Sequence, residues 1–268
     1  MHTSDNSETI VELDELELLV VMDNETDTLS SVDEGLPQLP EVAQLAARVP
    51  ASRHYEGHEC KTVFDQLCCG CHGLSVLMTG RRGDEEHTIL FDVGPYPQYW
   101  LDNAERLAID LADAHVLSNG FFYASGAIER VTAYETGLDG HHSFRGESAE
   151  PDPLIMDERY LAAVVRGRGV SVLSACSHAG IVNACLSAQQ RFPDVPVDVV
   201  LGGYHLAGKT MELRIADTIA DLEQRIKPRV VAPGHCTGWR AKAQLAATFA
   251  PGRYAPSVVG TLYRLQAE

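Results

Sequence analysis

The stretch SACSHAGIVNAC, residues 174–185, decides the fold of this chain. It continues an apolar run that begins at Gly169, turns through a short loop with a single histidine, and then enters a helical pattern from Ile181 to Arg191. An apolar run, a glycine-bearing loop and a helix in that order are typical of a buried strand that passes into a helix. The stretch therefore predicts an α/β protein with a histidine at the carboxyl end of a strand.

The same arrangement occurs twice more in the second half of the chain. The loops VLGGYHLAG, residues 200–208, and VAPGHCTGWRA, residues 231–241, each follow an apolar run and precede a helical pattern. They deliver His205 and His235 as the first loop delivers His178. Side chains at the carboxyl ends of strands in one sheet meet in a common crevice. Clustered imidazoles there are typical of a metal site or an acid/base centre.

The first half of the chain predicts a further set of strands and one irregular segment. Leu13 to Met22 is a mostly apolar run that ends at Asp23 and Asn24, which places both polar residues at the end of a strand. Residues 25–66 contain three prolines around a short helix-like piece at 41–47, and they predict an irregular insertion or lid. The remaining predictions are a hairpin of strands at 74–79 and 88–93, a helix at 97–111 and a loop at 134–157.

The second half completes a single domain over residues 1–268. Its predicted strands lie at 169–175, 197–201, 229–232 and 258–265, and its predicted helices lie at 181–191, 211–226 and 241–249.

Composition excludes several classes of protein. The 268 residues carry a formal net charge of −17 with 45% hydrophobic residues, which is typical of a globular protein with a sizeable core. An acidic surface repels phosphate backbones and anionic lipid, so we expect no nucleic-acid or membrane partner. The seven cysteines are irregularly spaced, as expected of reduced thiols. The acidic N-terminal sequence does not match an export signal, and we expect a cytoplasmic protein.

Several motifs occur in the order found in one known superfamily. They are VMDNETDTLSS at 21–31, CHGLSVLM at 71–78, ILFDVG at 89–94, LDNAERLAIDLADAHVLSNG at 101–120 and the three histidine loops. Together they resemble the metallo-β-lactamase fold superfamily, and within it the branch of dihydropterin ribofuranosyl-aminobenzene phosphate synthases. The resemblance implies an αββα sandwich, with two mixed β-sheets face to face and helices outside. It also implies a site for two metal ions that hold a hydroxide between them.

One segment departs from the superfamily pattern. The loop of the form H-x-H-x-D-H, which supplies the first metal ligands, aligns with VLSNGFFYASGAI at 116–128. Asn119 and Phe121 occupy the first two histidine positions, Tyr123 the aspartate and Ala124 the last histidine. These side chains are poor ligands or offer no lone pair. We therefore expect no metal or other cofactor in this chain, with His178, His205 and His235 as the remaining candidates for a single ion.

The altered segment has more than one interpretation. Its aromatic residues could fill the space left by the ions, so that the remaining histidines serve only hydrogen bonding. Alternatively, the site could still bind a small aromatic or heterocyclic molecule. Phe121, Phe122 and Tyr123 would then form a stacking wall, and the polar groups would come from Asp23, Asn24, His72, Asp92 and Tyr204. A relocated metal at His54, His58 and the cysteines of 60–72 is a weaker hypothesis, because paired C-x-x-C spacing is absent.

The sequence favours a supporting role for this chain. A fold retained around a degenerate site predicts a non-catalytic subunit that pairs with a homologous subunit or with itself. An intact homologue would carry zinc, iron or manganese and act as a small-molecule hydrolase. Two alternatives remain open: a stand-alone hydrolase with a single-metal or metal-independent site, and a sensor that binds a small molecule.

Overall fold

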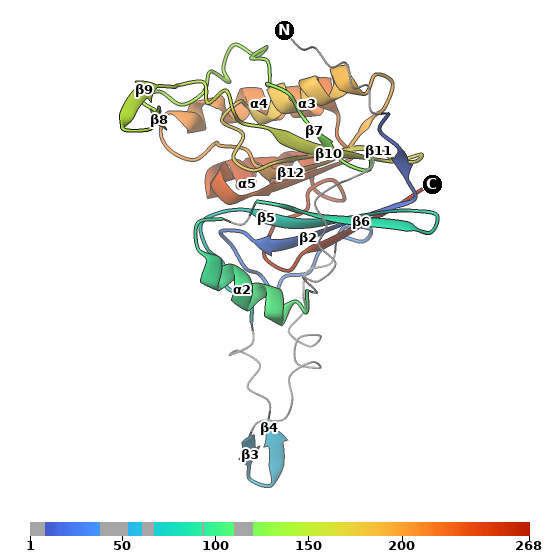
Figure 1. Ribbon diagram of the computed structural model, residues 1–268. Coiled ribbons are helices and arrows are strands. Elements are labelled where there is room, and N and C mark those ends of the chain that lie inside the picture. The colour runs from blue at the N-terminus through green and yellow to red at the C-terminus, as the bar shows by residue number, and fades with distance from the viewer. Residues whose placement is uncertain (1–8, 38–52, 61–66, 93, 110–119) are drawn as a thin grey trace.

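Two β-sheets lie face to face with helices on both outer faces (Figure 1). The computed structural model describes residues 9–37, 53–60, 67–92, 94–109 and 120–268. The predicted αββα sandwich is confirmed in this part of the chain. The helix-like piece predicted at 41–47 lies outside the described residues.

The larger sheet carries the three histidine loops. Its strands are β1 (Glu12–Leu13), β7 (Tyr123–Ala124), β10 (Tyr160–Val165), β11 (Gly169–Ser174), β12 (Val197–Gly203) and β13 (Val230–Gly234). They lie in the order β1-β10-β11-β12-β13, and β7 pairs with the edge of β10. The strands β11, β12 and β13 are parallel neighbours, whereas β10 is antiparallel to β11. The carboxyl ends of β11, β12 and β13 therefore meet at one edge.

The smaller sheet is antiparallel throughout its described strands, which corrects the prediction of two mixed sheets. Its strands are β2 (Glu15–Met22), β5 (Ser75–Arg82), β6 (Glu85–Phe91) and β14 (Leu262–Gln266), in the order β14-β2-β5-β6. The predicted hairpin is confirmed as β5 and β6. The apolar run at the N-terminus serves both sheets, because β1 pairs with β10 while β2 pairs with β5.

The helices cover the two outer faces of the sandwich (Figure 1). The helix α2 (Pro97–Arg106) packs on β2, α3 (Ile181–Arg191) on β11 and β12, and α5 (Trp239–Phe249) on β13. The predicted helix at 211–226 is a 3₁₀ turn η2 (Met211–Arg214), the helix α4 (Ile215–Asp221) and a π turn η3 (Leu222–Ile226). These positions match the predicted helices to within a few residues, except that α2 ends at Arg106.

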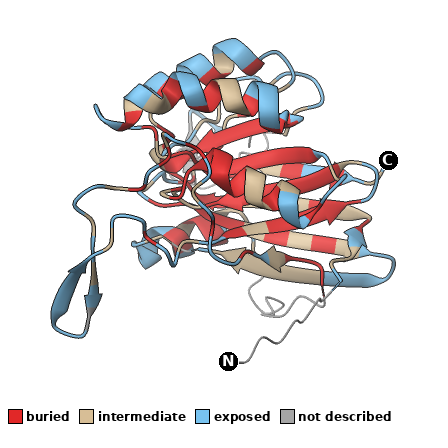
Figure 2. Cartoon of the chain, turned by 90° about the horizontal axis from the view of Figure 1, so that it is seen from above, coloured by how far each residue is buried: buried red, intermediate tan, exposed pale blue. Residues whose placement is uncertain are grey.

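The core between the sheets follows from alternation along the strands. Leu16, Leu18 and Val20 of β2 are fully buried and face the same inner side, where they pack with residues such as Leu173 and Leu201 of the larger sheet. Period-two burial of this kind is expected of a strand with one covered face. Figure 2 shows the buried strands between layers of helices whose outer sides are exposed.

Two parts of the predicted pattern are wrong. The segment 134–157, predicted as a loop, contains a hairpin of β8 (His142–Arg145) and β9 (Ser148–Pro151). Its described side chains are largely exposed, so no apolar alternation marks it. Strand β10 was not predicted, although it lies inside the larger sheet between β1 and β11. The predicted insertion contains a separate hairpin, β3 (Arg53–Tyr55) and β4 (His58–Cys60).

No helix in the described part of the chain is long and apolar enough to cross a membrane.

Candidate functional site

A cavity of about 540 Å³ lies where the ends of the two sheets meet. The larger sheet contributes Cys176 and His178 from the loop after β11, and His235 from the 3₁₀ turn η4 (His235–Thr237) after β13. The smaller sheet contributes His72, just before β5, and Asp92, just after β6. The cavity is also lined by Gly73, Leu74, Gly94, Pro95, Ile155, Asp157, Glu158, Arg159 and Ala175. Its volume is within the range of small-molecule pockets.

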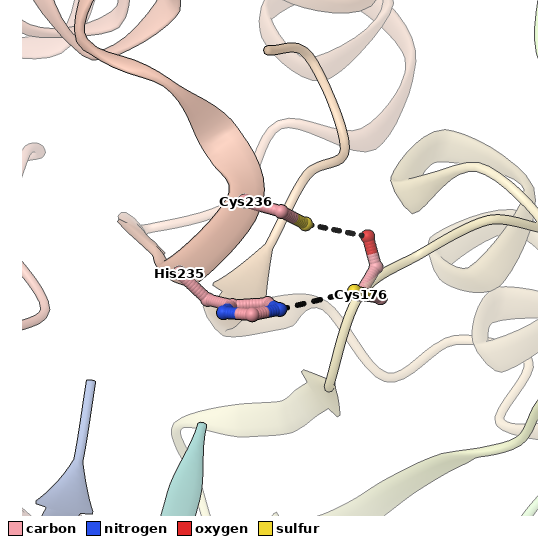
Figure 3. Close-up of side chains that lie close together, drawn as sticks. All are labelled: Cys176, His235 and Cys236. Carbon is pink, nitrogen blue, oxygen red and sulfur yellow. Dashed lines mark hydrogen bonds between the residues drawn. The ribbon is translucent and has the colours of Figure 1, made fainter. Parts of the chain in front are cut away.

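Cys176 lies in direct contact with two neighbours from the loop after β13 (Figure 3). Its Sγ atom is 3.1 Å from His235 Nε2, and the Cys236 thiol donates a hydrogen bond to the Cys176 carbonyl oxygen at 3.2 Å. Interaction with the Cys236 side chain lowers the pKa of the Cys176 thiol, and hydrogen bonds from His178, His205 and His235 lower it further against the effect of burial. These contacts favour the thiolate form of Cys176, the form that binds metals and reacts as a nucleophile.

His235 is held in one orientation by the end of β2. Its backbone N–H donates to Asp23 Oδ1 at 2.9 Å, and its Nδ1 lies 3.0 Å from Asn24 Oδ1. Because the amide oxygen of Asn24 only accepts, Nδ1 carries the proton and Nε2 faces Cys176. Burial acts to lower the pKa of His235, but the hydrogen bond with Cys176 raises it, and the pKa lies above its ordinary value.

His178 is held in a similar way by Glu158. Its Nδ1 lies 3.0 Å from Glu158 Oε1, and the same carboxylate accepts hydrogen bonds from the backbone N–H groups of His178 and Ala179. Hydrogen bonds first with Cys176 and then with Glu158 raise the pKa of His178 to about 10. The ring of His178 also lies against the ring of His205, with centroids 4.6 Å apart. His178 thus lies beside Cys176 at the cavity, with its ring fixed by Glu158.

Asp23 is a buried carboxylate that organises the edge of the site. Its side chain is fully buried and accepts hydrogen bonds from His235, from the Ser257 hydroxyl at 2.8 Å and from the Asn24 backbone at 2.6 Å. Burial raises the pKa of this carboxyl. The close approach requires Gly234, because a Cβ there would lie 2.3 Å from Asp23 Oδ2. Asp23 therefore positions the His235 loop without lining the cavity.

The residues predicted for the pocket fall into distinct groups in the structure. His72, Asp92, His178 and His235 line the cavity. Asp23 and Asn24 hydrogen-bond His235 without lining the cavity, and the ring of His205 contacts that of His178. Tyr204 is buried and donates its hydroxyl to the Val200 carbonyl at 2.8 Å, so its phenol belongs to the core. Asn119 lies outside the described residues.

The aromatic residues expected as a stacking wall are not brought to the cavity. Phe121 and Phe122 are buried between the sheets beside Gly80, which is near the far end of β5 from the cavity. The absence of a side chain at Gly80 makes room for both rings, since a Cβ there would lie 3.1 Å from Phe121 and 3.3 Å from Phe122.

The next two residues of that segment lie on the edge strand β7. Tyr123 is half-buried against the rings of Tyr160 and Phe192, and Ala124 is exposed. The aromatic segment therefore does not fill the cavity.

The cysteine-rich segment forms no metal cluster among its described side chains. Cys68 is buried, Cys69 is exposed and Cys71 is half-buried, and none of them joins a group of ligands. Burial raises the pKa of the Cys68 thiol to about 11, as expected of an inert thiol. The side chains of His54 and Cys60 lie outside the described part of the structure.

Sequence reasoning missed Cys176, Cys236 and Glu158. Each cysteine is one or two positions from a predicted histidine, in the motifs CSH and GHC, and that proximity was the available signal. Glu158 lies in a segment with no motif, and only the fold brings it to His178.

The described residues do not fit the two-metal site of the superfamily. Phe121, Tyr123 and Ala124 take three of the missing ligand positions, and none of them lines the cavity. A single ion fits better. Within the described residues the ligand atoms of Cys176, His178 and His205 lie within 4.8 Å of one another, as do those of Cys176, His235 and Cys236. Among the described residues the three histidines form no such group by themselves, and Cys176 is the residue that the two groups share.

Comparisons with known proteins agree with the architecture. The chain superposes on the crystal structure of Tm1679, a metal-dependent hydrolase of the β-lactamase superfamily, with a TM-score of 0.58 and 20% identity over 94% of this chain and 99% of that one. No protein-family model matches the chain.

A sequence relative comes from Methanocaldococcus jannaschii. The chain is 35% identical over 80 residues to its 7,8-dihydropterin-6-methyl-4-(β-D-ribofuranosyl)-aminobenzene-5′-phosphate synthase. The match covers 30% of this chain and about a quarter, 26%, of that synthase. The chain has the metallo-β-lactamase fold, and its sequence is similar to the dihydropterin ribofuranosyl-aminobenzene phosphate synthase branch of that superfamily.

Proposed function

We propose that this chain is a small-molecule hydrolase with one reaction centre, at the cavity lined by His72, His178 and His235. The observation that carries the proposal is the cavity itself, which has a volume of about 540 Å³ and several convergent polar groups. An apolar pocket wall with a few placed acids and bases is typical of a site that binds and acts on a small ligand. A site refilled as core would have no such space.

The lining indicates the class of substrate. Asp92, Asp157 and Glu158 are acidic, whereas Arg159 is the one Lys or Arg side chain among the lining residues. This balance disfavours a phosphorylated molecule such as the product named for the Methanocaldococcus jannaschii synthase. An uncharged or weakly basic heterocycle with an ester, lactone or amide bond suits the cavity better. In hydrolysis, water adds to the acyl carbon, the bond to the leaving oxygen or nitrogen breaks, and the leaving group takes up a proton.

The reaction requires stabilisation of negative charge on the acyl oxygen and removal of a proton from water, and the chain has groups for both. The imidazoles of His72 and His235 line the cavity and can donate hydrogen bonds that stabilise developing negative charge on the acyl oxygen. The carboxylate of Asp92 lines the same cavity and can accept a proton from water.

Hydrolysis of a panel of aryl esters, lactones and heterocyclic amides tests the proposal. We expect turnover of at least one class, and a loss on the order of a hundredfold in kcat/KM for His235→Ala, as for removal of an acid/base group. His142→Ala is the matched control, because His142 is exposed on the β8–β9 hairpin and does not line the cavity. Turnover that is equal in the wild type and in His235→Ala would contradict the proposal.

A second candidate is a supporting subunit of a mixed hydrolase. The burial of Phe121 and Phe122 between the sheets favours it, because these residues stand in the segment that supplies metal ligands in the superfamily. An intact homologue would then contribute the two-metal site. Co-expression with such a homologue tests this candidate: co-purification and activity that requires both chains would support it. Full activity of the homologue alone, without association, would count against it.

A further inference from the structure

The side chains around Cys176 have the composition of a metal site that differs from the two-ion site of the superfamily. Cys176, His178 and His205 come from two loops at the ends of neighbouring strands β11 and β12. Their sulfur and nitrogen atoms lie within 4.8 Å of one another. Two ligands on a tetrahedral zinc ion are separated by about 3.3–3.8 Å, given bonds of about 2.0–2.3 Å. A small adjustment of the side chains therefore brings all three atoms onto one ion.

His178 has a carboxylate partner, Glu158, of the kind that metal-binding histidines commonly have. Glu158 Oε1 lies 3.0 Å from His178 Nδ1, and the carboxylate is itself fixed by the backbone N–H groups of His178 and Ala179. A histidine that binds a metal through one ring nitrogen commonly donates the other N–H to a carboxylate, which fixes the ring and increases its basicity. With Nδ1 engaged by Glu158, His178 has Nε2 available for an ion.

His205 has an unsatisfied ring nitrogen in the same place. Its Nδ1 atom is buried and has no hydrogen-bond partner in the structure, and its ring lies 4.6 Å from that of His178. The backbone of His205 is also in the left-handed region, with φ of 49°. A buried polar atom without a partner and a strained backbone both cost free energy, and both are typical of functional sites.

We propose that Cys176, His178 and His205 bind a single zinc ion, with the fourth position open. A thiolate with two imidazoles is a donor set that zinc prefers, and three protein ligands with one open position are typical of a catalytic ion. Cys176 and His178 line the cavity, so a ligand bound there is within reach of the ion. The inference deepens the proposed function and rests on it for the use of the ion, while the binding itself is measured without any substrate.

The alternative group around Cys176 is less suited to an ion. Cys236 donates its thiol hydrogen to the Cys176 carbonyl, and His235 is tied to Asp23 and Asn24. The atoms of Cys176, His235 and Cys236 nevertheless meet the same distance limit of 4.8 Å. Variants of Cys236 and His205 therefore separate the two groups.

Titration with cobalt, followed by absorption spectroscopy, tests the proposal on the full chain after chelation under reducing conditions. We expect one cobalt ion per chain, a thiolate-to-cobalt charge-transfer band and displacement by zinc. Cys176→Ser should remove the band. His205→Ala should lower the affinity for cobalt by more than a substitution of a residue that is not a ligand. Glu158→Gln should lower it by about 10–100-fold. His142→Ala, at an exposed position away from the cavity, is the matched control and should bind as the wild type does, whereas Cys236→Ser should lower the affinity less than His205→Ala does.

Three results would overturn the proposal: no stoichiometric binding, a cobalt complex without a thiolate band, or loss of binding in Cys236→Ser but not in His205→Ala. The wild-type spectrum alone tests for the thiolate ligand, so the conclusion does not depend on the folding of any variant. Binding without hydrolysis would leave this inference standing and count against the proposed function. Hydrolysis that persists in the metal-free chain would leave the proposed function standing and would show that the ion is not used in it, while the titration alone decides whether the ion binds.

Discussion

At the scale of single residues, the site depends on side chains that hold the histidines rather than on the histidines alone. Asp23, Asn24 and Glu158 each engage the Nδ1 atom or the backbone of a histidine, so that Nε2 of His235 faces Cys176. Fixed tautomers and fixed rings are what distinguish a working imidazole from a solvent-exposed one. The sequence predicted Asp23 and Asn24 as neighbours of the site because they end a strand, but it offered no signal for Glu158.

Removal of Asp23 should destabilise the fold as well as the site. Asp23→Ala leaves the buried His235 N–H and Ser257 hydroxyl, together with the part-buried Asn24 N–H, without their acceptor. We expect the free energy of unfolding to fall by roughly 2–4 kcal/mol. Denaturant unfolding measures the change, with Asp139→Ala at an exposed position as the control. A change for Asp23→Ala no larger than that of the control would show that Asp23 has no such role.

At the scale of the elements, the sequence predicts those whose pattern is local. The strands β2, β5 and β6 and the helices α3 and α5 follow from apolar runs, turn residues and helical spacing, and the structure confirms them. Strand β10 has an apolar run, YLAAVV, of the same kind as the run that predicts β11, and only the exposed hairpin of β8 and β9 has neither a buried face nor a periodic signal. The prediction that Phe121 and Phe122 line the pocket is wrong for another reason. The two rings pack where Gly80, on a strand distant in sequence, has no side chain.

The start of helix α3 depends on a buried carboxylate, Glu135. It accepts hydrogen bonds from the backbone N–H groups of Val182 and Asn183, which the first turn of a helix leaves without partners, and it contacts the Thr132 hydroxyl. Burial raises the pKa of Glu135 from 4.5 to about 7. Because the folded chain holds the proton more tightly than the unfolded chain, this group's contribution to stability is complete below about pH 4.5 and is lost as pH rises to about 7.

Glu135→Gln should remove that part of the pH dependence. Glutamine resembles the protonated acid, so the unfolding free energy of the variant minus that of the wild type should rise by about 3 kcal/mol between pH 4.5 and pH 8. The comparison needs no assumption about the stability of either protein at one pH. Denaturant unfolding at the two pH values measures it. A difference that stays constant with pH would show that Glu135 titrates normally.

At the scale of the whole molecule, the fold explains how residues far apart in the sequence meet at one site. Three parallel strands bring their loops to one edge, and the ends of β2 and β6 reach the same edge from the other sheet. This convergence follows from the order of the strands in the two sheets. The order of strands and loops predicted the convergence of the histidine loops, and the resemblance to the superfamily implied the sandwich. The sequence could not predict that Cys176 would be the centre of the cluster, because that depends on distances between side chains from separate loops.

The zinc content of the chain, purified without chelators, tests the central claim most directly. One reaction centre with a single ion predicts about one zinc ion per chain by elemental analysis, reduced to background in Cys176→Ser and unchanged in His142→Ala, whose side chain is exposed away from the cavity. Two ions per chain would contradict the account, because they would require ligands that the altered segment does not supply. Zinc that is unaffected by Cys176→Ser would contradict it as well.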